Sequence, residues 1–162
     1  MKYAKILTIF IIVCSIFSAC DVIEDRRCDH LGFEIADYTI IEEEDTHGGF
    51  HGDGSYYLIL DCSENPSQVH KAIKEWKELP LSDNLDLVMY GGEKHGMYYA
   101  YNFAEEAHLP TIQNGVYKFV DRHSASVDQS DDTNLFDRAS FNFSIAVYDL
   151  DTDTMYYFEK DT

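Results

Sequence analysis

Alternation of apolar and polar residues runs through much of the chain and indicates β-strands. The clearest case is 140–149, where Phe141, Phe143, Ile145 and Val147 occupy every second position. This period of two is typical of a strand with one buried face. Density of β-forming residues extends the same interpretation to other segments. The further strands predicted are 33–44, 55–61, 84–90, 96–103, 115–121 and 154–160.

One segment, 66–79, carries a helical pattern instead. Asn65 and Pro66 supply an N-cap and a proline at the first helical position, and Pro80 ends the pattern. Its apolar residues recur at the spacing of a single helix face: Val69, Ala72, Ile73 and Trp76. We expect Trp76 to pack on the sheet. The fold class predicted is α+β, an antiparallel sheet of about six to seven strands with one main amphipathic helix over about 66–79.

The first nineteen residues have the composition of a secretory signal peptide. Lys2 and Lys5 precede an uncharged apolar run over 6–17, which is shorter than the roughly 20 residues that a membrane-spanning helix needs. The stretch FSAC at 17–20 resembles the lipobox of bacterial lipoproteins. That resemblance implies cleavage before Cys20, a lipid such as diacylglycerol or palmitate on its thiol, and attachment to the outer face of the cell membrane.

Domain boundaries follow from this N-terminus. Residues 1–19 are expected to be the signal peptide, and 20–31, which are polar and without periodicity, a lipid-proximal tether. A single α+β domain is expected over 32–162. Two cysteines, Cys28 and Cys62, then remain for an exported chain, and an oxidising compartment would allow them to form a disulfide.

The charge of the chain is strongly negative. The sequence has 30 acidic and 12 basic residues, for a net charge of −18, and loss of 1–19 with their two lysines makes it −20. A nucleic-acid partner is disfavoured, since phosphate binding requires a basic surface. An acidic surface suits solubility, cationic peptides or divalent metals.

The stretch EEEDTHGGFHGDGS at 42–55 supports two interpretations. His47, His51 and Asp53 are residue types that bind zinc, and three such ligands with a water would suit a catalytic metal. The i, i+4 spacing of the histidines has that meaning on a helix, but the intervening glycines disfavour a helix. Four glycines between 48 and 54 are typical of a chain reversal. We therefore predict a turn joining antiparallel strands 38–44 and 55–61, with zinc as the alternative.

Other candidate chemistry is sparse. Asp128, Asp131 and Asp132 lie in the polar segment 124–138, where clustered carboxylates could bind calcium, although charge runs in loops are commonly solvated. The sequence contains no G-x-S-x-G nucleophile elbow and no phosphate-binding loop. These observations favour a protein without enzymatic activity.

The C-terminal half carries a second resemblance. The tail FDRASFNFSIAVYDLDTDTMYYFEKDT, preceded by YKFVDRHS, resembles an uncharacterised family of small exported proteins from Gram-positive bacteria, which implies no activity. The function expected is a lipid-anchored, non-enzymatic binding or interaction module of the cell envelope that binds a peptide or protein. The alternatives are a metal-dependent hydrolase using His47, His51 and Asp53, and an immunity-type lipoprotein that captures cationic peptides.

Overall fold

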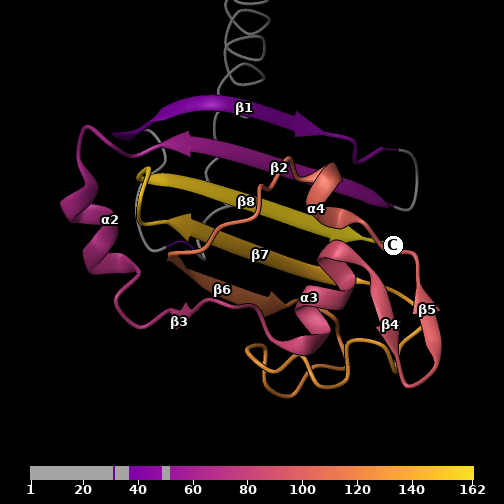
Figure 1. The fold of residues 1–162 in the computed structure, drawn as a ribbon. Coiled ribbons are helices and arrows are strands. Elements are labelled where there is room, and N and C mark those ends of the chain that lie inside the picture. The colour runs from indigo at the N-terminus through magenta and orange to yellow at the C-terminus, as the bar shows by residue number, and fades with distance from the viewer. Residues whose placement is uncertain (1–30, 32–36, 49–51) are drawn as a thin grey trace, which may run out of the picture. The chain divides into compact units, whose positions relative to one another are not determined.

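Six strands form the main sheet of the protein (Figure 1). They are β1 (Thr39–Asp45), β2 (Gly54–Asp61), β3 (Lys77–Glu78), β6 (Gly115–Asp121), β7 (Asn142–Asp149) and β8 (Thr154–Asp161). Their spatial order is β1-β2-β8-β7-β6-β3, and every neighbouring pair is antiparallel. The computed structural model describes residues 31, 37–48 and 52–162, and these elements belong to the unit Glu34–Thr162.

The central strands were predicted correctly. β2, β6, β7 and β8 lie within two residues of the strands predicted over 55–61, 115–121, 140–149 and 154–160. β7 and β8 form a hairpin in which Asp149 pairs with Thr154. The α+β class with an antiparallel sheet is therefore correct.

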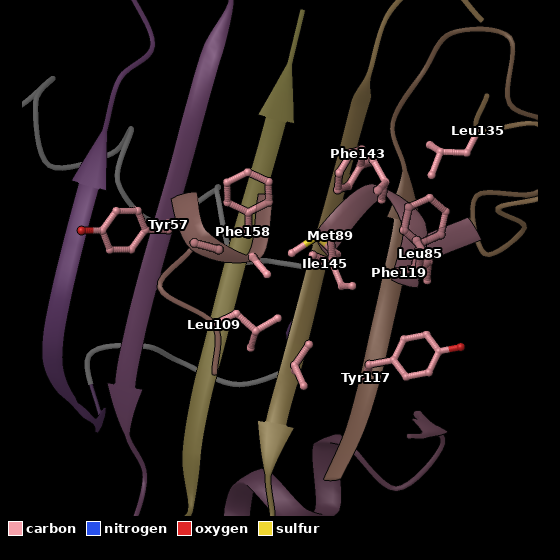
Figure 2. Close-up of a cluster of buried hydrophobic side chains, with 14 of the residues drawn as sticks. Tyr57, Leu85, Met89, Leu109, Tyr117, Phe119, Leu135, Phe143, Ile145 and Phe158 are labelled. Carbon is pink, nitrogen blue, oxygen red and sulfur yellow. The ribbon is translucent and has the colours of Figure 1, made fainter. Parts of the chain in front are cut away.

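Three helices accompany the sheet: α2 (Pro66–Ala72), α3 (Asp83–Tyr90) and α4 (Phe103–Glu106). α3 and α4 lie over one face, where Leu85 and Met89 pack with Phe143, Ile145 and Phe158 of β7 and β8 (Figure 2). None of the helices among the described residues has the length and apolar character needed to cross a bilayer. The core is thus a layer of aromatic and aliphatic side chains between the sheet and two short helices.

The prediction of one buried face for 140–149 was wrong, because β7 is buried on both sides. Ala146 and Tyr148 point away from the core cluster and are still only 3% and 0% exposed. At this second face the ring of His70 in α2 meets the ring of Tyr148 edge-on, with 5.7 Å between centroids. A buried tyrosine hydroxyl requires a hydrogen-bond partner. The Tyr148 hydroxyl donates to Asp153 Oδ1 at 2.7 Å.

The helix predicted over 66–79 is shorter than expected. α2 ends at Ala72, and Lys77 and Glu78 instead pair with Tyr117 and Val116 of β6. Backbone pairing at the open edge of β6 replaces the last helical turn, since tertiary hydrogen bonds override a helix propensity worth only tenths of a kcal/mol per residue. Trp76 is half-buried and lines a hollow with β6 residues, so it does lie against the sheet.

The strand predicted over 84–90 was wrong, because this segment is α3. The Ser82 side chain caps the helix by accepting from the Leu85 amide at 3.3 Å, and Gly91 ends it with a φ of 71°. The burial of Leu85, Val88 and Met89 follows the i, i+3, i+4 spacing of a helix. The strand prediction for 84–90 rested on its content of β-forming residues, and that criterion does not detect helical spacing.

The strand predicted over 96–103 is only partly present. β4 (Gly92–Lys94) and β5 (Met97–Tyr99) form a separate hairpin, and Phe103 already begins α4. The reversal between β4 and β5 is confined to His95 and Gly96. Both have positive φ, 53° and 76°, as tight hairpin turns require.

Candidate functional site

The connection from β1 to β2 reverses the chain, as the glycine-rich stretch predicted. β1 and β2 pair in antiparallel register from Thr39 opposite Asp61 to Asp45 opposite Tyr56. Thr46 closes the reversal by donating its amide to the Ser55 carbonyl at 2.8 Å. A Cβ on Gly54 would come within 2.6 Å of the His47 Cα, so the close approach of the two chain segments requires glycine there. Residues 49–51 lie outside the described part.

His47 lies between two carboxylates. Its Nδ1 is 2.7 Å from Asp45 Oδ1 and its Nε2 is 3.1 Å from Asp161 Oδ2. Both ring nitrogens can donate at once only in the imidazolium form. This arrangement ties the β1–β2 connection to the end of β8.

The zinc alternative remains a prediction. Asp53 is exposed, and His51 lies outside the described residues. Within the described ranges, no group of three His, Cys, Asp or Glu side chains could hold a metal ion.

A polar network continues from His47 across the sheet. Arg122 Nη2 donates to Asp161 Oδ2 at 3.0 Å and to the Phe143 carbonyl at 3.1 Å, and lies 3.9 Å from Glu159. Glu159 is 7% exposed and accepts hydrogen bonds from Ser144 and Tyr157. A buried carboxylate requires such partners, so this network is a structural element of the sheet end.

Ser55 joins a second polar group on the core side of the same sheet end. Its hydroxyl donates to Glu106 and accepts from Lys160 Nζ at 2.7 Å, while Lys160 Nζ lies 3.2 Å from Glu106. A serine beside a lysine can be a nucleophile with a general base. Here the lysine is ion-paired and Ser55 is 3% exposed, so the trio links α4 to β2 and β8 instead.

Strand β1 is an exposed acidic edge. All seven of its residues are exposed, and Glu42, Glu43, Glu44 and Asp45 follow one another along it. Ile40 and Ile41 are 48% and 57% exposed. The register shifts between Ile40 and Glu42, so a β-bulge at Ile41 bends the strand. In the described part of the chain only β2 pairs with β1.

Two of these carboxylates are held by tyrosine and histidine side chains. Glu42 Oε1 accepts from the Tyr57 hydroxyl at 2.8 Å and lies 3.0 Å from His108 Nδ1. These contacts, the His108 one foremost, lower the pKa of Glu42, and the same carboxylate raises the pKa of Tyr57 to about 12. Glu43 accepts from the Tyr56 hydroxyl at 2.8 Å. The edge therefore presents ionised carboxylates in fixed positions.

Asp128 and Asp131 in the 124–138 segment bond locally, whereas Asp132 contacts Ser82. Asp128 Oδ1 accepts from the Ser130 amide and Asp131 Oδ1 from the Thr133 amide, both at 2.9 Å, and Asp132 accepts from Ser82. Carboxylates in this role stabilise turns. Calcium binding by the three stays a prediction.

The cysteine predictions fall partly outside the described residues. Cys62 is buried, and this burial, with the nearby Asp61 carboxylate, raises the pKa of its thiol to about 12. Cys20 and Cys28 belong to the part that the structure does not describe. Lipid attachment at Cys20 and pairing of Cys28 with Cys62 therefore stay predictions.

Comparison with known proteins gives no relative on which to base a function. No protein-family model matches the chain, and searches of curated proteins and of solved structures return no match. Function must therefore be argued from the geometry of this chain.

Proposed function

We propose that the protein is a lipid-anchored, non-enzymatic binding module of the cell envelope, which captures an extended cationic peptide segment on strand β1. The observation that supports this proposal is that all seven residues of β1, a strand at the sheet edge with four consecutive acidic residues, belong to the exposed class. The proposal joins two expectations from the sequence, an envelope binding module and the capture of cationic peptides.

An edge strand offers backbone groups to a partner. Each strand at the edge of a sheet leaves a row of N–H and C=O groups without a strand neighbour. An extended peptide can add there as a further strand, so that main-chain hydrogen bonds provide affinity and side chains provide specificity. The exposed Ile40 and Ile41 provide apolar contact at one end of this edge.

Charge decides which peptides suit this edge. Glu42 and Glu44 are opposite Ile59 and Tyr57 in the register, and Glu43 and Asp45 are opposite Leu58 and Tyr56, so carboxylates project on both faces of the sheet. A peptide with lysine or arginine on alternate residues would place cations beside them. The net charge of −18 adds long-range attraction for such a peptide.

A binding experiment tests the edge directly. The full chain in phosphatidylcholine nanodiscs, which carry no net charge, is titrated with an acetylated octapeptide of alternating lysine and threonine. The triple variant Glu42→Gln, Glu43→Gln, Glu44→Gln keeps the oxygen that accepts from tyrosine but removes three charges. We expect about tenfold weaker binding, because loss of three exposed charge contacts at about 0.5 kcal/mol each totals about 1.5 kcal/mol.

Two matched controls separate strand addition from general attraction. The variant Glu64→Gln, Glu75→Gln, Glu78→Gln removes the same charge away from β1 and should bind like the wild type. A peptide with the same lysines but two prolines in place of threonines should bind at least about tenfold more weakly, since proline cannot donate to a strand ladder. Equal binding of both peptides, or equal loss in both variants, would refute the edge as the site.

The lipid anchor requires its own experiment. Replacing Cys20 by alanine removes the thiol that would carry the lipid, so the protein should leave the membrane fraction. Each buried methylene of an acyl chain contributes about 0.8 kcal/mol to membrane binding. Fractionation with mass spectrometry of the mature N-terminus measures both location and acyl mass. Cys14→Ala is the control and should remain membrane-bound, while an unmodified Cys20 in the wild type would contradict the anchor.

A further inference from the structure

A cavity of about 490 Å³ opens above the sheet between three segments that are distant in sequence. The chain around the Leu79–Pro80 bond, helix α3, and the connection over 109–113 that follows α4 (Figure 1) form its walls. Residues that carry the argument are Leu79, Leu109, Ile112, Val147, Asp86 and Tyr90. A volume of this size lies in the range of small-molecule pockets, roughly 300–1,000 Å³.

Apolar core residues form the floor of this cavity, while polar groups make up about half of the surface that it exposes. Val147 of β7 and Leu109 are buried, at 2% and 8% exposure, and belong to the main hydrophobic core. Leu79 and Ile112 are half-buried and pack against the same core. The cavity is therefore a continuation of the core that remains open, and it suits the apolar body of a ligand.

Among the residues that line the cavity, Asp86 carries the only charge. Asp86 is exposed on α3, and no lining residue is lysine, arginine or histidine. Among the described residues no cation forms an ion pair with Asp86, since the ion pairs found involve other acids. The Tyr90 hydroxyl lies 3.4 Å from the Pro110 carbonyl, and burial, with the charge of Asp86, raises the pKa of Tyr90. Its neutral phenol thus borders an uncompensated carboxylate.

We propose that this cavity binds an amine with an apolar body, with the ring or alkyl group against Leu79 and Ile112 and the ammonium beside Asp86. An anion would be repelled by Asp86 and by the net charge of −18. A neutral ligand would leave the carboxylate without a partner. The site is separate from β1, because β2 and β8 lie between β1 and β7 in the sheet, so it does not depend on the edge proposal.

Methyl NMR on the full chain in a mild detergent tests the site, with 2-phenylethylamine as probe. Binding should shift the methyl signals of Leu109 and Ile112 and leave those of Ile41 on β1 unchanged. Asp86→Asn should weaken binding of the amine about two- to fivefold, which is the loss of one exposed charge contact. Asp83→Asn, in the same helical turn but outside the cavity lining, should bind like the wild type.

Two analogues of the amine, one uncharged and one negatively charged, complete the experiment. 2-Phenylethanol should bind more weakly than the amine and equally to wild type and Asp86→Asn, and 3-phenylpropanoate should bind most weakly. Competition by acetyl-Phe-Lys-amide would identify a peptide side chain as the source of the amine, and its failure to compete would identify a free amine; either supports the proposal. Equal affinity for all three probes, equal weakening by Asp83→Asn, or no saturable shift would overturn it.

Discussion

Replacing Arg138 by methionine should lower the free energy of unfolding by about 3–5 kcal/mol, because it leaves a buried carboxylate without its cation. Arg138 Nη1 and Nη2 reach the two oxygens of Asp121 at 2.7 and 2.6 Å, a bidentate pair. The two side chains are 13% and 2% exposed. Asp121 is the last residue of β6 and Arg138 is the last residue of the segment 124–138. The pair therefore holds the connection between β6 and β7 against the sheet. Chemical denaturation of wild type and variant measures the loss.

The double variant Asp121→Leu, Arg138→Met is the control. Removing both charges should restore much of the stability, since apolar residues of similar volume often replace a buried ion pair without loss. If the single and double variants unfold at the same denaturant concentration, the cost does not come from the stranded carboxylate.

The stability difference should also depend on pH. Burial raises the pKa of Asp121, but hydrogen bonds from Arg138 and from the neighbouring residues lower it by more, so its pKa lies below the ordinary value. A carboxyl with a lowered folded-state pKa stabilises the protein above its unfolded pKa, about 3.9, and this contribution disappears as pH falls through the folded pKa. The gap between wild type and Arg138→Met should therefore be full at pH 7 and close as pH falls, because protonation of Asp121 removes the stranded charge in the variant and the ion pair in the wild type.

Replacing Phe143 by alanine should lower the free energy of unfolding by about 3–5 kcal/mol. Phe143 is fully buried, and its ring centroid lies 5.9–6.2 Å from those of Phe119, Phe141, Phe103 and Phe158. The substitution removes apolar surface and also opens a cavity in this aromatic cluster, of which Figure 2 labels Phe119, Phe143 and Phe158. Such a loss is a large share of a typical folding stability of 5–15 kcal/mol.

Phe143→Leu separates the two contributions. Leucine keeps most of the apolar volume, so we expect a loss of only about 1–2 kcal/mol. Calorimetric melting of the three proteins ranks them. A melting temperature for the alanine variant equal to that of the leucine variant would contradict the packing that the structure shows around this ring.

The two proposed binding sites are both negative in charge, yet they would suit ligands of different shapes. The edge β1 presents carboxylates along an extended line, with Glu42 and Glu43 held by tyrosines. The cavity presents one carboxylate, Asp86, above an apolar floor. An extended basic peptide suits the first and a compact amine suits the second, so the two proposals can fail separately.

Some site residues can be identified from the local sequence, but their contacts are made by residues far away in the chain. His47 was identified from its place in a glycine-rich stretch, but its partner Asp161 lies 114 positions away, and no local pattern predicts that contact. Asp86 and Tyr90 lie in the segment 84–90, for which the sequence predicts a strand, and no local pattern marks them as site residues. Ser82 before acidic Asp83, followed by Gly91, was the available signal of a capped helix.

The sequence by itself determined the elements whose evidence is local. Alternation over 140–149 and the density of β-forming residues over 154–160 predict β7 and β8 because both signals are local. The glycines before Ser55 predict the reversal into β2 because few residues other than glycine accept so close a backbone. Tertiary structure decided the rest. Lys77 and Glu78 became β3 because β6 offered a free edge, and burial selected the helical phase of 83–90 over its strand-like composition. The cavity exists only because 79–81, α3 and 109–113 meet above Val147, and contacts between segments so far apart in the chain depend on the folded arrangement of all of them.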